Sequence, residues 1–564
     1  MAVNYSKHFN TKVVPQTQPV PGKGMKKNSA GGFSFGVNDW TQLQRFLILG
    51  SEGGSYYASA KSLTVENAEA LVRCAKSDGR RTVDMIVETS KSGRAPKNDP
   101  ALFALAVCAG LDGLDPSTKT YALSKLSEVA RIPTHLFTFL DNVEGFRGWG
   151  RGLREGVANW YNSKDLKTLA YQMVKYRQRG GWSHRDVLRK SHPRTLEQAR
   201  SALYALAANN FSGEVGENHQ ILTERRLPKA SRESLVEKAS VVVPGQDEFR
   251  VVEGFLRAQK ATSVAEVVRL VQDYRLTREM VPTDYAGKPE VMEALLPNMP
   301  LNALIRNLGN LTRLGVVENF SENLKLVESK LASDKAIRDA RVHPIALLNA
   351  LNVYNAGGTL GKSKNTWTPV QRIVDALDAA FYTAFNAITP TNKRLMLALD
   401  VSGSMSWNNI AGCEGLTPRV ASAAMALVTA NVEKDHGIYS FSTGLSELSI
   451  SPRMRMNDVI RKVSNLNFGG TDCALPMVWA KKNKVDVDAF VIYTDSETWY
   501  GSIHPFQALK EYRNATGINA KLIVVGMVAN KFSIADPSDS GMLDVVGFDT
   551  ATPQLMSEFI LGNI

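Results

Sequence analysis

Apolar residues recur every three or four positions through most of the chain between Asp39 and about Ala387. This spacing is typical of amphipathic helices, and segments such as DPALFALAVCAGL, VAEVVRLVQDY and LNALIRNLGNLTRLG show it clearly. Strand-like alternation is nearly absent from the same region. A string of helices of similar length indicates paired-helix repeats, so we predict an α-helical, HEAT-like repeat domain over residues 36–388, although no strict sequence period emerges.

The pattern changes beyond Pro390. Short apolar runs such as RLMLALDVS and DAFVIYTDS alternate with helical segments such as RVASAAMALVTANVE. Alternating strands and helices predict a parallel sheet with helices on both faces. We therefore expect an α/β domain over residues 390–564, and a mainly α, multidomain protein as a whole.

Two stretches follow neither pattern. Residues 1–35 are rich in Pro, Gly, Lys and Asn, and we expect them to form a flexible basic arm. Residues 355–369 form a polar, Gly-rich connector that contains the Walker A-like series AGGTLGKS (356–363). A phosphate-binding loop follows a buried strand, whereas a helical segment precedes this series, so we interpret it as a linker.

Charge is unevenly distributed along the chain. The net charge is +12, yet from Thr391 onward 15 Lys and Arg stand against 17 Asp and Glu, a balance of −2. The first 390 residues hold 52 and 38 of these residues, a balance of +14. A polyanionic partner is therefore expected to bind the N-terminal part of the protein.

Cysteine usage and hydropathy restrict the class of protein. The cysteines are far apart and form no CxxC pair, which argues against a disulfide framework or a zinc ribbon; they are Cys74, Cys108, Cys413 and Cys473. No apolar run approaches the roughly 18 residues of a membrane helix, and the polar start MAVNYSKHFNTK lacks a signal-peptide core. These features predict a cytoplasmic protein with no membrane association.

A strongly basic stretch, KYRQRGGWSHRDVLRKSHPR (175–194), has Asp186 as its single acid. Upstream apolar spacing predicts a helix that continues to Gly180-Gly181 and stacks Lys175 and Arg179 on one face. Ser183 with Asp186 predicts a capping box for a second, short helix, which the following Pro ends. Two basic helices are thus expected to meet at a tight turn.

Phosphate is the natural counter-charge for this stretch, and Trp182 and the histidines offer planes on which bases can stack. A solvated basic face without a ligand is the alternative. The candidate RNA contacts are Lys175, Arg179, His184, Arg185, Arg189 and His192.

Acidic and hydroxyl side chains cluster where the predicted strands of the C-terminal domain end. One strand ends in DVSGS (400–404), another in DSE (495–497), and a third loop reads GGTD (469–472). Ligands bind beyond the carboxyl ends of parallel strands. This hard oxygen set suits Mg²⁺ or Mn²⁺ rather than zinc. A serine hydrolase is disfavoured because no GxSxG elbow or partnered His accompanies these serines.

The three loops, in this order, resemble the metal-ion-dependent adhesion site of a von Willebrand factor A domain. That resemblance implies a Mg²⁺ site with the ligands Asp400, Ser402, Ser404, Thr471 and Asp495. Helix capping by the hydroxyls, with Asp400 an ordinary loop residue, is the alternative.

Longer segments resemble the TROVE-domain family. They are RFLILGSEGGSYYASAKSLTVENAEAL (45–71), KYRQRGGWSHRDVLRKSHP (175–193), MPLNALIRNLGNLT (299–312), FGGTDCALPMVWA (468–480) and VIYTDSETW (491–499). The resemblance implies that the helical repeats close into a ring whose basic outer surface binds small structured Y RNAs. It also implies that the central hole admits single-stranded 3′ ends of misfolded or decaying non-coding RNA.

The family positions for Y RNA contact match Lys175, Arg179 and His192, and the resemblance implies an exoribonuclease such as polynucleotide phosphorylase as a partner. Candidates for lining the hole are Arg147, Arg151 and Arg154. An equally favoured alternative is that the Gly-rich stretch that contains them forms a turn or packs in the core.

Three hypotheses follow. The leading one is a non-catalytic RNA-binding protein that serves RNA quality control or processing. The second is a Mg²⁺-dependent adhesion scaffold that binds an acidic protein ligand at the metal site. The third, a Mg²⁺-dependent nuclease, is weak. It needs clustered carboxylates beside a groove that binds RNA, whereas the C-terminal part carries a slight negative charge.

Overall fold

The computed structural model describes residues 13–51, 60–216, 219, 221–222, 247–358, 365–385, 388–407, 409–410, 416–466 and 469–564. Helices dominate the first two thirds of the chain. They are α1 Asp39–Leu49, α2 Ala60–Ser77, α3 Gly79–Ser92, α4 Asp99–Gly110, α5 Pro116–Ser124, α6 Leu126–Val129, α7 Pro133–Glu144, α8 Arg151–Asn162, α9 Leu166–Lys175, α10 His184–Ser191, α11 Gln198–Ala208, α12 Arg250–Lys260, α13 Val264–Tyr274, α14 Pro289–Leu295, α15 Leu301–Arg313, α16 Glu322–Leu331, α17 Asp334–Asp339, α18 Pro344–Asn355 and α19 Gln371–Thr383.

Local sequence explains where many of these helices begin. Asp78 accepts a hydrogen bond from Arg81 N at the start of α3, and Ser263 does the same from Glu266 N at the start of α13. Such side chains satisfy backbone N–H groups that the first turn leaves without partners. Pro116 and Pro133 occupy first helical positions, where the missing N–H is harmless.

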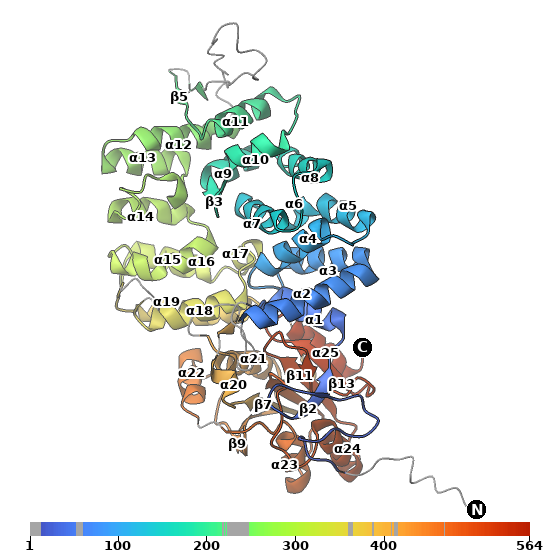
Figure 1. Cartoon of the computed structure of the whole chain (residues 1–564). Coiled ribbons are helices and arrows are strands. Elements are labelled where there is room, and N and C mark those ends of the chain that lie inside the picture. The colour runs from blue at the N-terminus through green and yellow to red at the C-terminus, as the bar shows by residue number, and fades with distance from the viewer. Residues whose placement is uncertain are drawn as a thin grey trace, which may run out of the picture.

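The helices follow a closed loop (Figure 1). They rise from α2 to α8, cross through α10 and α11, descend through α12 to α16, and return through α18. The loop is closed by His343, just before α18, whose Nε2 lies 3.0 Å from the backbone oxygen of Arg94, just after α3. The predicted mainly α, repeat-like region is therefore confirmed.

The C-terminal part forms a six-stranded sheet of order β13-β11-β10-β7-β8-β9, in which only the edge strand β9 runs antiparallel. Its strands are β7 Leu395–Asp400, β8 His436–Phe441, β9 Leu445–Glu447, β10 Ala489–Thr494, β11 Lys521–Gly526 and β13 Met542–Val546. The helices around it are α20 Ser404–Trp407, α21 Pro418–Val432, α22 Met456–Ser464, α23 Leu475–Asn483, α24 Pro505–Thr516 and α25 Thr552–Leu561.

Alternate residues of the central strand β7 pack into two different cores. Leu397 joins a core that includes α21 and continues into the helical loop, whereas Ala398 joins a second core with α23 and α24. Because side chains alternate across a strand, this arrangement requires apolar cover on both faces. The prediction of an α/β domain with helices on both faces is confirmed.

The expectation of a flexible arm over residues 1–35 is wrong for residues 13–35; residues 1–12 lie outside the described residues. Strand β1 Lys26–Lys27 pairs with β2 Phe33–Gly36, which pairs with β12 Phe532–Ser533. Gln16 is fully buried, and its Nε2 donates to Asp472 Oδ1 at 2.7 Å. The segment is ordered by partners far along the chain, which its Pro- and Gly-rich composition does not reveal.

The connector around residues 355–369 follows helix α18 directly, as the linker interpretation requires. Its described ends meet at an isolated bridge between Gly358 and Thr366. The Gly-Lys-Ser part of the Walker A-like series (361–363) lies outside the described residues. Within the part of the chain that the structure describes, no helix is both long and apolar enough to cross a membrane.

Candidate nucleic-acid interface and metal site

The basic stretch folds as a helix, a hairpin and a second helix. Helix α9 runs from Leu166 to Lys175, and the carboxylate of the preceding Asp165 accepts a hydrogen bond from Thr168 N at 2.7 Å. The chain then forms strands β3 Gln178–Arg179 and β4 Trp182–Ser183, joined by Gly180 and Gly181 with φ of 56° and 84°. Positive φ at both central residues is what a two-residue type I′ turn requires.

The prediction that α9 continues to Gly180-Gly181 is therefore wrong, and Arg179 lies on a strand rather than one helical turn beyond Lys175. Apolar spacing stops with Met173 and Val174, and the hairpin turn needs both glycines. The capping box is confirmed: Asp186 N donates to Ser183 Oγ, and Ser183 N donates to the Asp186 carboxylate. His192 caps the C-terminus of α10 with φ of 47°.

Buried apolar residues anchor the helices and the hairpin on the core of the helical loop. Leu169 and Met173 of α9 and Val187 of α10 are fully buried. Trp182 is 8% exposed, and Lys190 Nζ lies 4.7 Å above its ring while pairing with Glu144 at 2.7 Å. The polar faces of both elements are therefore held toward solvent.

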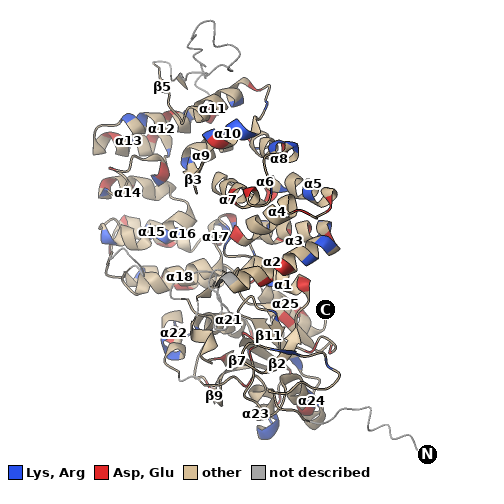
Figure 2. Ribbon diagram, viewed as in Figure 1, with Lys and Arg blue, Asp and Glu red and all other residues tan. Residues whose placement is uncertain are grey.

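These elements border an open depression of about 900 Å³. Five cations line it, whereas only two acids, Asp186 and Glu279, do so; the cations are Lys175, Arg177, Arg179, Arg185 and Arg189. Among the described residues, Arg179, Arg185 and Arg189 form no ion pair with an acid. Figure 2 shows the concentration of Lys and Arg on α10. Unpaired cations around a depression favour binding of a phosphate-rich ligand.

The structure brings together five of the six predicted RNA contacts around this depression: Lys175, Arg179, His184, Arg185 and Arg189. His192 is exposed at the end of α10 but does not line it.

His184 borders the depression, but its side chain is enclosed, which argues against the predicted RNA contact. Its side chain is 1% exposed, its Nδ1 lies 2.8 Å from the Tyr161 hydroxyl, and burial lowers its pKa to about 3. A neutral, enclosed imidazole offers little surface to a phosphate, and the RNA contact of His184 stays a prediction.

Sequence reasoning did not single out Arg177. Its guanidinium lies over the Phe255 ring at 4.9 Å and lines the depression. The signal was Arg177 two residues before Arg179, because residues two apart share one face of an extended segment.

The three arginines of the Gly- and Trp-rich stretch lie in different surroundings. Arg147 donates to the Ala109 carbonyl at 2.9 Å, and Arg151 pairs with Glu155 at 2.7 Å. Arg154 is exposed on α8. Arg147 thus supports a turn, as the alternative interpretation expected, and the hole-lining role of all three stays a prediction.

The predicted metal ligands lie at the carboxyl ends of adjacent strands β7 and β10. Asp400 is fully buried; its Oδ1 accepts from Ser402 N at 2.9 Å and its Oδ2 from Thr494 Oγ1 at 2.7 Å. The hydroxyls of Ser402 and Ser404 are 3.0 Å apart. Four of the five predicted ligands, Asp400, Ser402, Ser404 and Asp495, are thus gathered at one sheet edge.

Thr471 reaches this edge through its loop. Its backbone oxygen accepts from Trp499 N at 3.0 Å and from Thr498 Oγ1 at 3.2 Å, which ties its loop to the one that follows Asp495. Thr471 is 1% exposed. All five predicted ligands are therefore buried at or beside the same end of the sheet.

Electrostatics at this edge favour a cation. Burial raises the pKa of Asp495, and the nearby charges of Asp400 and Glu497 raise it further. Burial also raises the pKa of Glu497 to about 7. Close acids repel one another in a dry site unless a positive charge stands between them. In the described part of the chain, no three His, Cys, Asp or Glu residues form a metal-holding group, so a Mg²⁺ here would depend on two carboxylates with hydroxyls and water.

Comparisons with known proteins agree with this architecture. The family model for the TROVE domain matches residues 26–365, and that for the Ro60 vWA domain matches residues 394–560. The "RNA-binding protein RO60" of Deinococcus radiodurans is 41% identical over 551 residues, which cover 98% of each chain. The protein of the same name in Caenorhabditis elegans is 36% identical over 605 residues, which cover 98% of this chain and 92% of the relative.

A crystal structure of the Deinococcus radiodurans RO (RSR) protein matches with a TM-score of 0.67 at 40% identity, over 93% of this chain and 100% of that one. The match spans both the helical loop and the sheet domain. The chain therefore belongs to the TROVE-domain family of Ro proteins.

Proposed function

We propose that this protein is a non-catalytic RNA-binding protein whose basic depression receives a small structured RNA. The observation that carries the proposal is the convergence of Lys175, Arg179, Arg185 and Arg189 on one open depression with few acids. Such a surface binds phosphates and positions a folded RNA without reading much sequence. The names of two relatives, both RNA-binding proteins, support this assignment.

The finer part of the proposal concerns which RNA is bound. Y-type RNA is the expected ligand of the depression, and single-stranded 3′ ends of misfolded or decaying RNA are the expected ligands of the helical loop. In this role the protein serves RNA quality control or processing in the cytoplasm. An exoribonuclease such as polynucleotide phosphorylase is the expected partner.

Removing two cations tests the depression directly. We expect Lys175→Ala with Arg179→Ala to weaken binding of a Y-type RNA about tenfold. The slope of log affinity against log salt should shrink by about 1.8, because two phosphate contacts are lost. Filter binding or fluorescence anisotropy at several salt concentrations measures both quantities.

The matched control is Lys325→Ala with Arg338→Ala. These exposed cations on α16 and α17 pair with Glu322 and Asp334, outside the depression. Unchanged affinity and slope in the Lys175/Arg179 variant would contradict the proposal. Labelled RNA should also stay intact with pure protein and Mg²⁺; cleavage would support a nuclease instead.

A second proposed function is metal-dependent binding of a protein. Asp400, Ser402, Ser404, Thr471 and Asp495 would hold a Mg²⁺, which supplies an open position for a partner's carboxylate. The raised pKa of Asp495 between neighbouring acids favours this site.

Calorimetric titration with Mg²⁺ tests the metal, and partner capture with and without EDTA tests the adhesion. Asp400→Ala should abolish Mg²⁺ binding and EDTA-sensitive capture while leaving Y-type RNA binding unchanged. Partners that are indifferent to both EDTA and the substitution would count against a metal-bridged contact.

A further inference from the structure

A second depression, of about 340 Å³, lies between α15 and α18. Its volume is within the range of about 300–1,000 Å³ typical of small-ligand sites. Pro96 and Lys97, from the segment after α3, form one edge, so the depression stands at the seam where the loop of helices closes. In Figure 1, α15 and α18 lie across this loop from α9 and α10.

One wall of the depression is aromatic. Trp367 packs in stacked orientation on Tyr354, with centroids 6.1 Å apart and 26° between the rings, and its Nε1 donates to the Tyr354 carbonyl at 2.9 Å. Gly309 lets the indole approach α15, because a Cβ there would lie only 2.7 Å from its Cη2. The indole is therefore fixed in place, yet it stays half-buried at the wall.

Polar groups complete the depression. The Oδ1 atom of Asn349 is buried and has no hydrogen-bond partner among the described residues. A buried amide without a partner is costly, and rotation about its last torsion can turn either end toward a ligand. Arg306, on the rim, is exposed and makes no ion pair within the described ranges.

We propose that this depression binds one nucleotide of a single-stranded RNA, a site that deepens the proposed RNA-binding function and rests on it. The base stacks on the indole of Trp367, the Asn349 amide bonds the base edge, and Arg306 neutralises the adjoining phosphate. A fixed aromatic plane, an amide and a rim cation are what recognition of an unpaired base requires. The depression is too small for a duplex and distinct from the basic depression at α9 and α10.

A substitution that fills the depression tests the site without removing any native side-chain contact. Ala350 lines the depression from α18 and is half-buried, so Ala350→Trp occupies the space of the base while α18 keeps its packing. The probe is a fluorescein-labelled single-stranded RNA of about ten nucleotides. We expect Ala350→Trp to weaken its binding about tenfold, since one stacked base is lost.

Arg306→Ala should weaken the same probe about threefold and reduce its salt slope by about 0.7, the value for one phosphate on a single strand. Arg269→Ala is the matched control, because Arg269 is an exposed arginine of α13 that does not line the depression. It should change neither quantity.

Y-type RNA separates this inference from the proposed function. Ala350→Trp and Arg306→Ala should bind it as wild type does, whereas Lys175→Ala with Arg179→Ala should not. Equal single-strand binding by wild type and Ala350→Trp, or no single-strand binding by wild type, overturns the nucleotide site and leaves the Y-type proposal standing. Loss of both RNAs in a folded Ala350→Trp protein also overturns it.

Discussion

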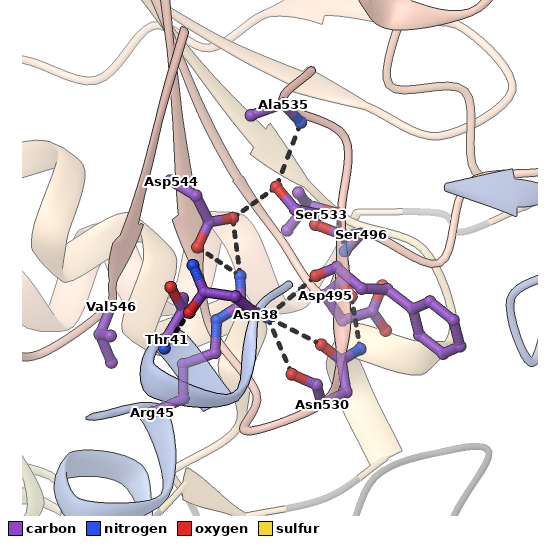
Figure 3. A network of polar contacts seen from close by, with 12 residues as sticks. Asn38, Thr41, Arg45, Asp495, Ser496, Asn530, Ser533, Ala535, Asp544 and Val546 are labelled. Carbon is purple, nitrogen blue, oxygen red and sulfur yellow. Dashed lines mark hydrogen bonds and ion pairs between the residues drawn. The ribbon is translucent and has the colours of Figure 1, made fainter. Parts of the chain in front are cut away.

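Arg45 and Arg73 each pair with an aspartate through short hydrogen bonds, yet their surroundings differ sharply. The side chain of Arg45 is 0% exposed and that of Asp544 is 14% exposed, whereas the values for Arg73 and Asp39 are 52% and 38%. Figure 3 shows Arg45 reaching from α1 to Asp544 and to Asn530 of the sheet domain. The burial of an ion pair decides what its loss does to stability.

We expect Arg45→Met to lower the free energy of unfolding by about 3–5 kcal/mol, because the largely enclosed Asp544 carboxylate keeps the Ser533 hydroxyl but loses its charged partner. Arg73→Met, the matched control, should cost less than about 1 kcal/mol, since its pair is exposed to water. Urea denaturation followed by fluorescence measures both changes. Similar losses in the two variants would contradict a special role for the buried pair.

For single residues, the sequence predicts which side chains can take part in binding but not which of them are exposed. His184 and His192 stand in the same basic stretch, and only the structure shows that one is enclosed beside Tyr161 while the other is exposed. Asp400 was predictable as a strand-end acid, because DVSGS follows an apolar run. Burial of a single polar side chain depends on partners distant in sequence, which local pattern does not contain.

Among the elements, the hairpin between α9 and α10 decides where Arg179 lies. Gly180 and Gly181 both have positive φ and no atom within 4 Å of an added Cβ, so a substitution there would strain only the backbone. The left-handed region costs other residues roughly 1–2 kcal/mol each.

We therefore expect Gly180→Ala with Gly181→Ala to displace Arg179 and weaken Y-type RNA binding about fivefold, although every cation is retained. Gly287→Ala is the control, because Gly287 also has open space around it but no positive φ. Anisotropy titration compares the variants. Full affinity in the double variant would show that Arg179 does not need the hairpin.

Elements whose signals are local could be predicted, and those that depend on distant pairing could not. The helices of the loop and the βα alternation follow from periodicity, and the capping box at Ser183 from two residues. Strand β2, in contrast, exists because it pairs with β12 near the other end of the chain. A glycine pair is equally compatible with a helix stop and a hairpin turn, so the sequence alone predicts the end of α9 too far along the chain.

The closure of the helical loop, which shapes the whole molecule, involves a contact made by His343. Its Nδ1 accepts from Ile345 N at 3.1 Å, so Nε2–H donates to the Arg94 oxygen. Arg94 in turn donates from Nε to Asp549 of the sheet domain at 2.9 Å. Burial lowers the pKa of His343 to about 4, despite the backbone oxygens nearby and the Asp549 charge.

This lowered pKa predicts acid sensitivity with a definite sign. The unfolded His, with a pKa near 6.5, takes up a proton before the folded one does. The contribution of His343 to the free energy of unfolding is thus fully present above about pH 6.5. It falls by roughly 3 kcal/mol as the pH decreases toward about 4. We expect His343→Gln to flatten the fall in unfolding free energy over that range, relative to wild type.

Urea denaturation at a series of pH values measures this difference, with the exposed His192→Gln as control. A pH profile of His343→Gln that parallels wild type would show that closure of the loop does not depend on this imidazole. The other histidines whose pKa values burial lowers, His135, His184 and His504, keep their contributions in both proteins, so only the difference is informative.

The pairing of β2 with β12 joins residues 36 and 532, so nearly the whole chain separates two neighbouring strands. During synthesis at about 5–20 residues per second, the first segment waits roughly 25–100 s for its partner to leave the ribosome. Until then Phe35 lacks Phe506 and Gln16 lacks Asp472, the distant partners beside which they are buried in the finished protein. The nascent chain therefore cannot complete its N-terminal end first, and chaperones that hold emerging apolar segments are expected to act on it longer than on a protein whose domains finish in order.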